Sequence, residues 1–252
     1  MSDELPALPW ERTRRRTGPA RIPLTRDRII EAAYTVLDRV GYEKLSMRQV
    51  AAELGVAVSA LYAHVSSKDE LLELMYLRMF RDWELPPPDP DNWREQIRQY
   101  ARTGRTRLHE HRDMARIAMT GFPFSAEALP HLEQLLALFR AGGLPDHLAG
   151  AAGDMISTFI NGFAFEESVW EDRQEEVDES PRDQPVSERS WAEIRETLER
   201  YFRELPPDRF PNLVELSDVM LQRTNDERFD LGIEIIIRGL ASYAAEHPRP
   251  AE

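Results

Sequence analysis

The most regular feature of the chain is the recurrence of apolar residues at helical spacing. Between Arg26 and Val40, apolar side chains fall at positions i, i+3, i+4 and i+7, namely Ile30, Ala33, Tyr34 and Leu37. A second stripe of the same kind lies between Met47 and Leu54, after Ser46 and Gln49, a pair typical of a capped helix start. Gly41 and Gly55 follow these stripes and predict the two helix ends.

Two further helices are expected before the first proline-rich segment. A short helix is predicted from Ser59 to His64, and a longer one from Ser67, with Glu70 three residues on, to about Trp83. The sequence Leu85-Pro-Pro-Pro-Asp-Pro90 then acts as a stiff spacer. We therefore expect a small helical head domain over residues 24–85, preceded by a flexible basic arm over residues 1–23.

The helical period continues beyond the spacer, and no sustained alternation indicates strands. The expected helices are 92–111, 113–120, 126–141, 145–171, 190–204, 211–221 and 226–245. Residues 172–188 are acidic and poor in large apolar residues, which predicts a mobile loop. The predicted fold is all-α, with a larger helical body domain over residues 92–247.

Charge is distributed unevenly along the chain. The 252 residues carry a net charge of −13. From Glu11 to Lys68, however, basic residues outnumber acidic ones by 5, which leaves −18 for the remainder. A positive leading segment on an acidic body suits a protein that presents one end to a polyanion and repels it elsewhere.

Composition and the lack of other motifs narrow the function. The chain has no cysteine, which excludes a disulfide scaffold and thiolate chemistry. No apolar run reaches membrane-spanning length and the first residues lack a secretory signal, so we expect a cytoplasmic protein. We also expect no cofactor and no metal. A hydrolase that recruits Glu166 and Glu167 with His109 or His111 is an alternative, but no G-x-S-x-G, P-loop or H-E-x-x-H motif is present. We expect no enzyme; a helical adaptor that does not bind DNA is the second alternative.

Two short helices around a glycine turn, behind a longer helix and a basic arm, have the layout of a helix-turn-helix. The third helix is expected to pack through Leu61 and Val65 and to enter the major groove of DNA. Arg48 is the strongest candidate for reading a base, because a guanidinium can bond O6 and N7 of guanine together. Groups expected to face the groove or the phosphates are Ser46, Val58, Ser59, Ala60, Tyr62, Ala63, His64, Ser67 and Lys68.

The segment Leu24 to Met75 resembles the DNA-binding domain of the tetracycline-repressor (TetR) family over its whole length. The resemblance is carried by LGV, LY, HV and a lysine before an acidic and apolar run. It implies phosphate contacts from Thr25, Tyr62, His64 and Lys68, and base or groove contacts from Arg48, Val58, Ser59, Ala60 and Ala63. Val58, Ser59 and Ala63 stand where the tetracycline repressors carry Gln, Pro and Trp, so a different operator is expected. The alternatives are that Arg48 is a solvated surface charge, that Tyr62 mainly packs, and that the arm is a solubilising tail rather than a clamp on DNA.

A weaker resemblance to the C-terminal domain of the tetracycline repressors runs from Trp93 to Leu240, most clearly in HRDMARI, FINGFAFEE and ERFDLGIEIIIRGL. It implies a homodimer formed by the helices at 145–171 and 226–245. The last helix has an apolar stripe with Ile235 off it, so it is apolar on more than one side; the stripe is Phe229, Ile233, Ile236, Ile237 and Leu240. Two-fold pairing predicts a near-palindromic operator in double-stranded DNA.

The same resemblance implies a small-molecule effector, here a hydrophobic or aromatic one. Its candidate contacts are Met114, Ile117, Met119, Phe122, Phe159, Phe163, Phe165 and Trp170, with Asn161 and Glu166 as polar points. The alternative is that the aromatic stripe Ile156, Phe159, Ile160 and Phe163 is ordinary core. Ala118 stands where the tetracycline repressors hold magnesium through a histidine, which argues against a metal–tetracycline ligand. The implied function is a repressor that leaves its operator when an effector moves the fourth helix; activation is the open alternative.

Overall fold

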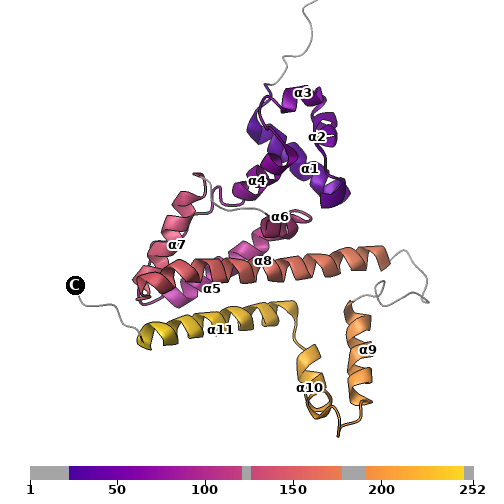
Figure 1. Cartoon of the computed structure of the whole chain (residues 1–252), viewed down its shortest axis with the longest axis vertical. Coiled ribbons are helices and arrows are strands. Elements are labelled where there is room, and N and C mark those ends of the chain that lie inside the picture. Colours follow the sequence, from indigo (N-terminus) through magenta and orange to yellow (C-terminus); the bar gives the residue numbers. More distant parts are fainter. Residues whose placement is uncertain (1–22, 121–125, 178–190, 247–252) are drawn as a thin grey trace, which may run out of the picture.

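The computed structural model describes residues 23–120, 126–177 and 191–246, and in these ranges the chain forms helices and connecting turns without any strand. Figure 1 shows a small head, coloured indigo, above a larger body built around one long helix. The all-α prediction is confirmed. The arm up to residue 22 and residues 178–188 of the expected loop lie outside the described residues.

The head contains four helices, each placed by a local sequence signal. They are α1 (Arg26–Lys44), α2 (Met47–Leu54), α3 (Val58–Leu61) and α4 (Lys68–Arg78). Thr25, Ser46 and Ser67 precede α1, α2 and α4, and each side-chain oxygen accepts a hydrogen bond from the backbone N–H three residues on. The predicted bonds to the Ser46 and Ser67 side chains are therefore confirmed. The return bond of a capping box, from the Ser67 N–H to the Glu70 side chain, is replaced: Glu70 accepts from the N–H and hydroxyl of Ser66.

Three helix ends in the head differ from the predicted ones. α1 continues to Lys44, but Gly41 interrupts it with φ 75° and ψ 170°, a conformation that suits glycine. α3 is a single turn that ends at Leu61, and residues 62–64 continue as a turn closed by the bond from the His64 N–H to the Leu61 carbonyl. α4 ends at Arg78 instead of Trp83, and the turns that follow include Asp82 at φ 60°.

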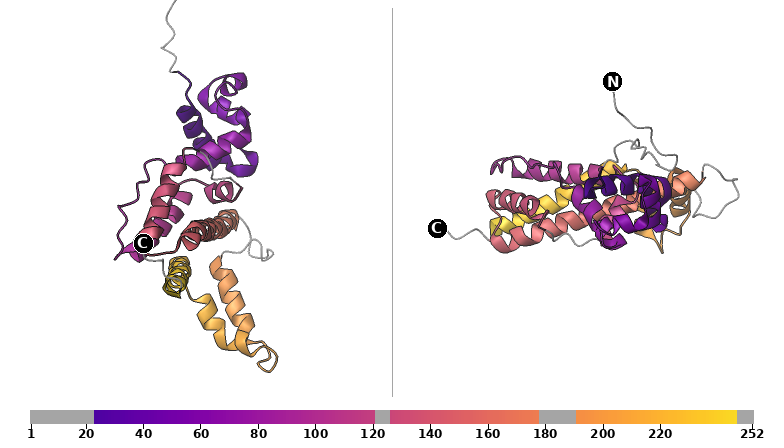
Figure 2. Two further views of the ribbon diagram at one scale, coloured as in Figure 1. Left: turned by 60° about the vertical axis from the view of Figure 1, so that its left-hand side comes forward. Right: turned by 90° about the horizontal axis from the view of Figure 1, so that it is seen from above.

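The body is arranged around α8. Its helices are α5 (Trp93–Leu108), α6 (Met114–Thr120), α7 (Leu129–Ala141), α8 (Asp146–Val177), α9 (Trp191–Arg203), α10 (Pro211–Leu221) and α11 (Asn225–Glu246). α5, α6, α7 and α11 all pack on α8, whereas α9 and α10 pack on each other and project away from it (Figures 1 and 2). α8 runs on to Val177, so the expectation of a loop from residue 172 is wrong for residues 172–177.

Ion pairs fix α11 against α5 in antiparallel orientation. Arg98, Arg102 and Arg105 lie on one face of α5, and their guanidinium nitrogens lie 2.7, 2.9 and 2.7 Å from the carboxylates of Glu234, Asp230 and Asp226. Arg105 also donates two hydrogen bonds to Glu167 of α8, whose side chain is buried. These contacts hold α5, α8 and α11 together as one unit.

None of the described helices combines the length and the apolar character that crossing a membrane requires.

Candidate DNA-binding surface and ligand cavity

The outer face of the head is formed by α2, a glycine turn and α3. Gly55 adopts a left-handed conformation at φ 65° and ends α2, as predicted. Leu61 and Val65 are 0% and 1% exposed and fix α3 to the core of the head. This confirms their predicted packing role, and it leaves the opposite side of α3 free to meet a groove.

Arg48 and Tyr62 are the most available functional groups on this face. Arg48 is exposed at the start of α2, and the described residues offer its guanidinium no ion pair or hydrogen bond. Tyr62 is 52% exposed. Both side chains can therefore extend toward a ligand outside the head.

The small residues in and just after α3 differ in solvent exposure, although all were predicted to be exposed. Ser59 and Ala63 are exposed, and Ala60 is half-buried. Val58 was expected outside, but it is half-buried and packs against the core, so that expectation is corrected. The first turn of α3 contributes less free surface than its sequence indicates.

The other predicted contacts flank this face. Thr25 is exposed and half-buried Ser46 and Ser67 lie at helix starts, where free backbone N–H groups favour phosphate oxygens. Lys68 donates to the Tyr42 carbonyl at 3.3 Å, and its ammonium lies 5.0 Å from the centre of the Tyr42 ring. His64 is half-buried, and its carbonyl accepts a hydrogen bond from Arg26 at 2.9 Å. The head thus has polar groups on either side of α3.

The end of α1 is tied to the body by two carboxylates. Asp113 Oδ2 accepts the Tyr42 N–H at 2.7 Å, and Asp113 itself has φ 58°, an uncommon value for a residue with a side chain. Asp38 accepts the Arg112 N–H at 3.0 Å and bonds His111 Nδ1 at 2.9 Å. The segment between α5 and α6 therefore forms a joint with the head.

α4 contacts α6 of the body and is bonded to α1 of the head. The Tyr34 hydroxyl donates to the Met75 carbonyl at 2.6 Å, and Arg78 forms ion pairs with Asp27 and Glu31 of α1 at 2.8 and 3.0 Å. Burial is the main cause that raises the pKa of Tyr34 well above its ordinary value, so its hydroxyl remains a donor. A displacement of α4 would therefore be passed directly to α1.

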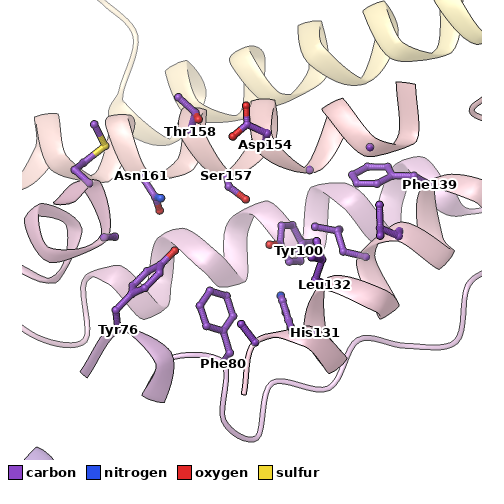
Figure 3. Close-up of a pocket in the computed structure, with 17 residues that line it drawn as sticks. Tyr76, Phe80, Tyr100, His131, Leu132, Phe139, Asp154, Ser157, Thr158 and Asn161 are labelled. Atoms are coloured by element: carbon purple, nitrogen blue, oxygen red, sulfur yellow. The ribbon is translucent and has the colours of Figure 1, made fainter. Parts of the chain in front are cut away.

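A cavity of about 350 Å³ lies in the body between α4, α5, α7 and α8 (Figure 3). Four aromatic rings form much of its wall: Tyr76, Phe80, Tyr100 and Phe139. Ser157 and Asn161 point from α8 toward these rings in Figure 3, whereas Asp154 and Thr158 are exposed residues of the rim. Such a chamber can hold a flat apolar molecule and offer it a few hydrogen bonds.

The two tyrosine hydroxyls in the wall are uncharged and partnered. Burial raises the pKa of Tyr100 to about 12, against the opposing effect of its hydrogen bond with Ser157. Burial also raises the pKa of Tyr76, whose hydroxyl bonds Asn161. α8 is thus linked through the cavity wall to α5 by one bond and to α4 by the other.

Family models match most of the chain. Residues 29–75 match the model described as bacterial regulatory proteins of the tetR family, and residues 85–243 match the tetracyclin repressor-like C-terminal domain. The chain belongs to the TetR family.

Relatives of this TetR-family chain match two thirds or more of its length. The HTH-type transcriptional repressor DrrR1 of Streptomyces coeruleorubidus is 31% identical over 95% of this chain and 85% of its own length. An HTH-type transcriptional regulator of Saccharopolyspora erythraea is 34% identical over 69% of this chain and 73% of its own. The structure of ActR from Streptomyces coelicolor in complex with actinorhodin has a TM-score of 0.77 and 38% identity, covering 88% of this chain and 99% of ActR. The chain is a TetR-family transcriptional regulator with an N-terminal helix-turn-helix, and regulators of this family are generally transcription factors without enzymatic activity.

Among the predicted effector contacts that the structure describes, two line the cavity of this TetR-family regulator. They are Met119 and Asn161. Phe159 and Phe163 pack against Phe229 of α11, with ring centroids 5.6 and 5.3 Å away, and Glu166 pairs with Arg228 at 3.0 Å. Met114 and Ile117 are 0% and 1% exposed. Phe165 and Trp170 are half-buried and away from the cavity, and Phe122 lies outside the described residues.

The expectation of one pocket lined by all these residues is therefore corrected. The core alternative describes the stripe on α8 better, because Ile156, Ile160 and Phe163 are buried and Phe159 packs against them. The predicted contacts leave out most of the cavity wall, including Tyr76, Phe80, Tyr100 and His131. The aromatic residues around the end of α4 are the sequence signal for Tyr76 and Phe80, whereas no local pattern indicates Tyr100 or His131.

Proposed function

We propose that this chain is a dimeric repressor that leaves a near-palindromic operator when a small aromatic effector occupies the cavity between α4, α5, α7 and α8. Arg48 would read a base, and the exposed surface of α3 would lie along the major groove. Tyr62, Thr25, His64 and Lys68 would contact phosphates on either side. Regulators of this family bind operator DNA as dimers and bind small-molecule effectors.

The observation that carries the proposal is that one helix belongs to both sites. Tyr76 of α4, and Phe80 directly after it, line the cavity, while Arg78 between them forms ion pairs with α1 of the head. A molecule that displaces either ring must move the turn of helix that holds α1. An effector can therefore change the position of the reading head without touching it.

Release requires that the effector favours one position of α4 over the other. A differential affinity of about 10-fold or more, roughly 1.4 kcal/mol, is the least that gives a useful response. The joint at Asp113 limits the motion, because the Tyr42 N–H bonded there stays attached to the body. We expect α4 to pivot α1 about this joint rather than to translate it.

The dimer is proposed to form through the outer faces of α8 and α11. Four of the five apolar residues predicted as a stripe on α11 are buried within the chain, whereas Ile235 and Leu231 are 62% and 41% exposed. Met155 of α8 is 49% exposed as well. Large exposed apolar side chains on two neighbouring helices favour burial against a second copy.

Fluorescence polarisation with a labelled operator duplex tests the release step. ActR has been crystallised with actinorhodin and with (S)-DNPA, so these two compounds are the first probes. We expect at least one of them to lower the polarisation of the operator complex, and Ser157→Phe, which places a ring in the cavity, to require about 10-fold more of it. Leu129→Phe is the control, because Leu129 is 54% exposed and does not line the cavity. Release that is unaffected by Ser157→Phe would exclude this cavity as the effector site.

A further inference from the structure

The cavity wall contains one polar ring that has no hydrogen-bond partner. His131 of α7 is 9% exposed, and neither Nδ1 nor Nε2 is hydrogen-bonded within the part of the chain that the structure describes. An unpaired buried polar group is unfavourable for folding, so its presence in a cavity needs an explanation. A ligand that supplies the missing hydrogen bonds is such an explanation.

Aromatic rings hold the imidazole in place. Its centroid lies 4.8 Å from those of Phe80 and Trp83 and 5.6 Å from that of Tyr100. Figure 3 shows the His131 side chain beside Phe80 and below Tyr100, on the side of the cavity opposite Ser157 and Asn161. A flat molecule between α7 and α8 would therefore have polar groups at both of its edges.

The imidazole is neutral at neutral pH. Burial lowers the pKa of His131 below its ordinary value, and the nearby charge of Arg107 acts in the same direction. The backbone of Trp83 lies near the ring and opposes this shift in part, without forming a well-aligned hydrogen bond with either nitrogen. A neutral imidazole offers one donor and one acceptor, the combination that a hydroxyl group can satisfy.

The remaining polar groups of the cavity are also uncharged in its interior. Tyr100 bonds Ser157, and Tyr76 bonds Asn161. Among the described lining residues there is no lysine or arginine, and the single charged side chain is Asp154 on the exposed rim. A buried anion would find no opposite charge there, which makes its desolvation unfavourable.

We propose that His131 is the polar anchor of this cavity and that it selects flat, uncharged aromatic molecules that carry a hydroxyl group. The proposal rests on the proposed function in one respect, since it takes this cavity as the effector site. It adds the chemical class of the effector and the residue that recognises it.

Calorimetric titration of the full chain, without DNA, tests the proposal with naphthalene, 2-naphthol and 2-naphthoate. We expect 2-naphthol to bind about 3- to 10-fold more tightly than naphthalene, as one neutral hydrogen bond allows, and more than 10-fold more tightly than 2-naphthoate. His131→Phe keeps an aromatic ring and removes both nitrogens. It should abolish the preference for 2-naphthol over naphthalene.

Three results would overturn the proposal: no binding of 2-naphthol, stronger binding of 2-naphthoate, or an unchanged preference in His131→Phe. The comparison of the three probes on the wild type stands even if the variant fails to fold, and His131→Asn, which keeps a donor and an acceptor, provides a second variant that should retain part of the preference. Operator binding without any probe is measured separately. A chain that binds its operator but shows no preference for 2-naphthol loses this inference alone, whereas a chain that binds no operator loses the proposed function.

Discussion

Arg48 combines exposure, charge and the absence of any partner among the described residues, and no other predicted contact in the head has all three properties. Lys68 is engaged with Tyr42, and Thr25 and Ser46 accept hydrogen bonds from their own helix starts. An unpaired guanidinium does not have to break an internal bond before it meets a base. Arg48 is therefore the residue on which sequence discrimination should depend most.

Arg48→Ala should weaken specific binding by about 1–3 kcal/mol, roughly 5- to 150-fold, and relax the preference at one base position of each half-site. The fold should be unaffected, because the side chain supports nothing in the head. Fluorescence polarisation titrations measure both effects, with the operator duplex and with variants of it that differ at single bases. Arg140→Ala is the control, since it removes the same charge from an exposed site on α7. Equal losses for the two variants would mean that Arg48 acts only through its charge.

Backbone caps and turns depend on neighbours in the sequence and could be predicted from it. Which side chains line the cavity depends on packing between helices and could not. The caps at Ser46 and Ser67 and the left-handed Gly55 depend on neighbours within a few positions, and the structure has them as predicted. On α8, the family resemblance implied effector contacts from Phe159, Phe163 and Asn161, and only Asn161 of these three lines the cavity. Ser157 lines it too, because α5 and α7 lie on that side of α8, which no local pattern reveals.

At the scale of the helices, Glu167 is the buried connection between α5 and α8. Its carboxylate accepts hydrogen bonds from Arg105 at 2.8 Å and lies 3.1 Å from His109 Nε2. Burial alone would raise the pKa of Glu167, but the hydrogen bonds from His109 and Arg105 outweigh it and hold the pKa below its ordinary value. A carboxyl group of this kind stabilises the folded state above its unfolded pKa of about 4.3 and loses that effect as the pH falls through the lower, folded value.

Glu167→Gln should lower the free energy of unfolding at pH 7 by about 2 kcal/mol, because Arg105 keeps its charge but loses its buried carboxylate partner. Below about pH 4 the difference between variant and wild type should shrink as the wild-type carboxyl group becomes protonated. Urea unfolding of both proteins at pH 7 and below about pH 4 measures this difference in the free energy of unfolding. Glu166→Gln is a close control: Glu166 is also paired with an arginine, but its side chain is 44% exposed, so we expect a change below about 1 kcal/mol. A difference for Glu167→Gln that stays constant with pH would contradict the account.

The presence of the helices was predicted more reliably than the residues at which they end. α10 begins and ends where the sequence indicated, because Pro211 suits a helix start. α8 extends to Val177 through residues 172–177, for which the acidic sequence predicts a loop. Glutamate, arginine and glutamine are good helix formers, so a long helix continues through them even without an apolar face.

At the scale of the whole molecule, α8 and α11 present apolar side chains that the single chain does not cover. Ile235→Glu should therefore convert a dimer into a monomer, because two like charges would be buried at a two-fold interface. Sedimentation velocity at micromolar concentration measures the change, and operator affinity should fall with it. Leu129→Glu, at an equally exposed position on α7, should leave the dimer intact. An unchanged sedimentation coefficient for Ile235→Glu would place the interface elsewhere.

The most direct test of the central claim is selection of bound duplexes from random DNA by the purified full chain. The account predicts one enriched near-palindrome, with half-sites about 34–36 Å apart along the helix axis and at least one guanine in each half-site that depends on Arg48. Recovery of all sequences with equal frequency, even at low salt, would show that the head binds DNA only through charge and would contradict the account.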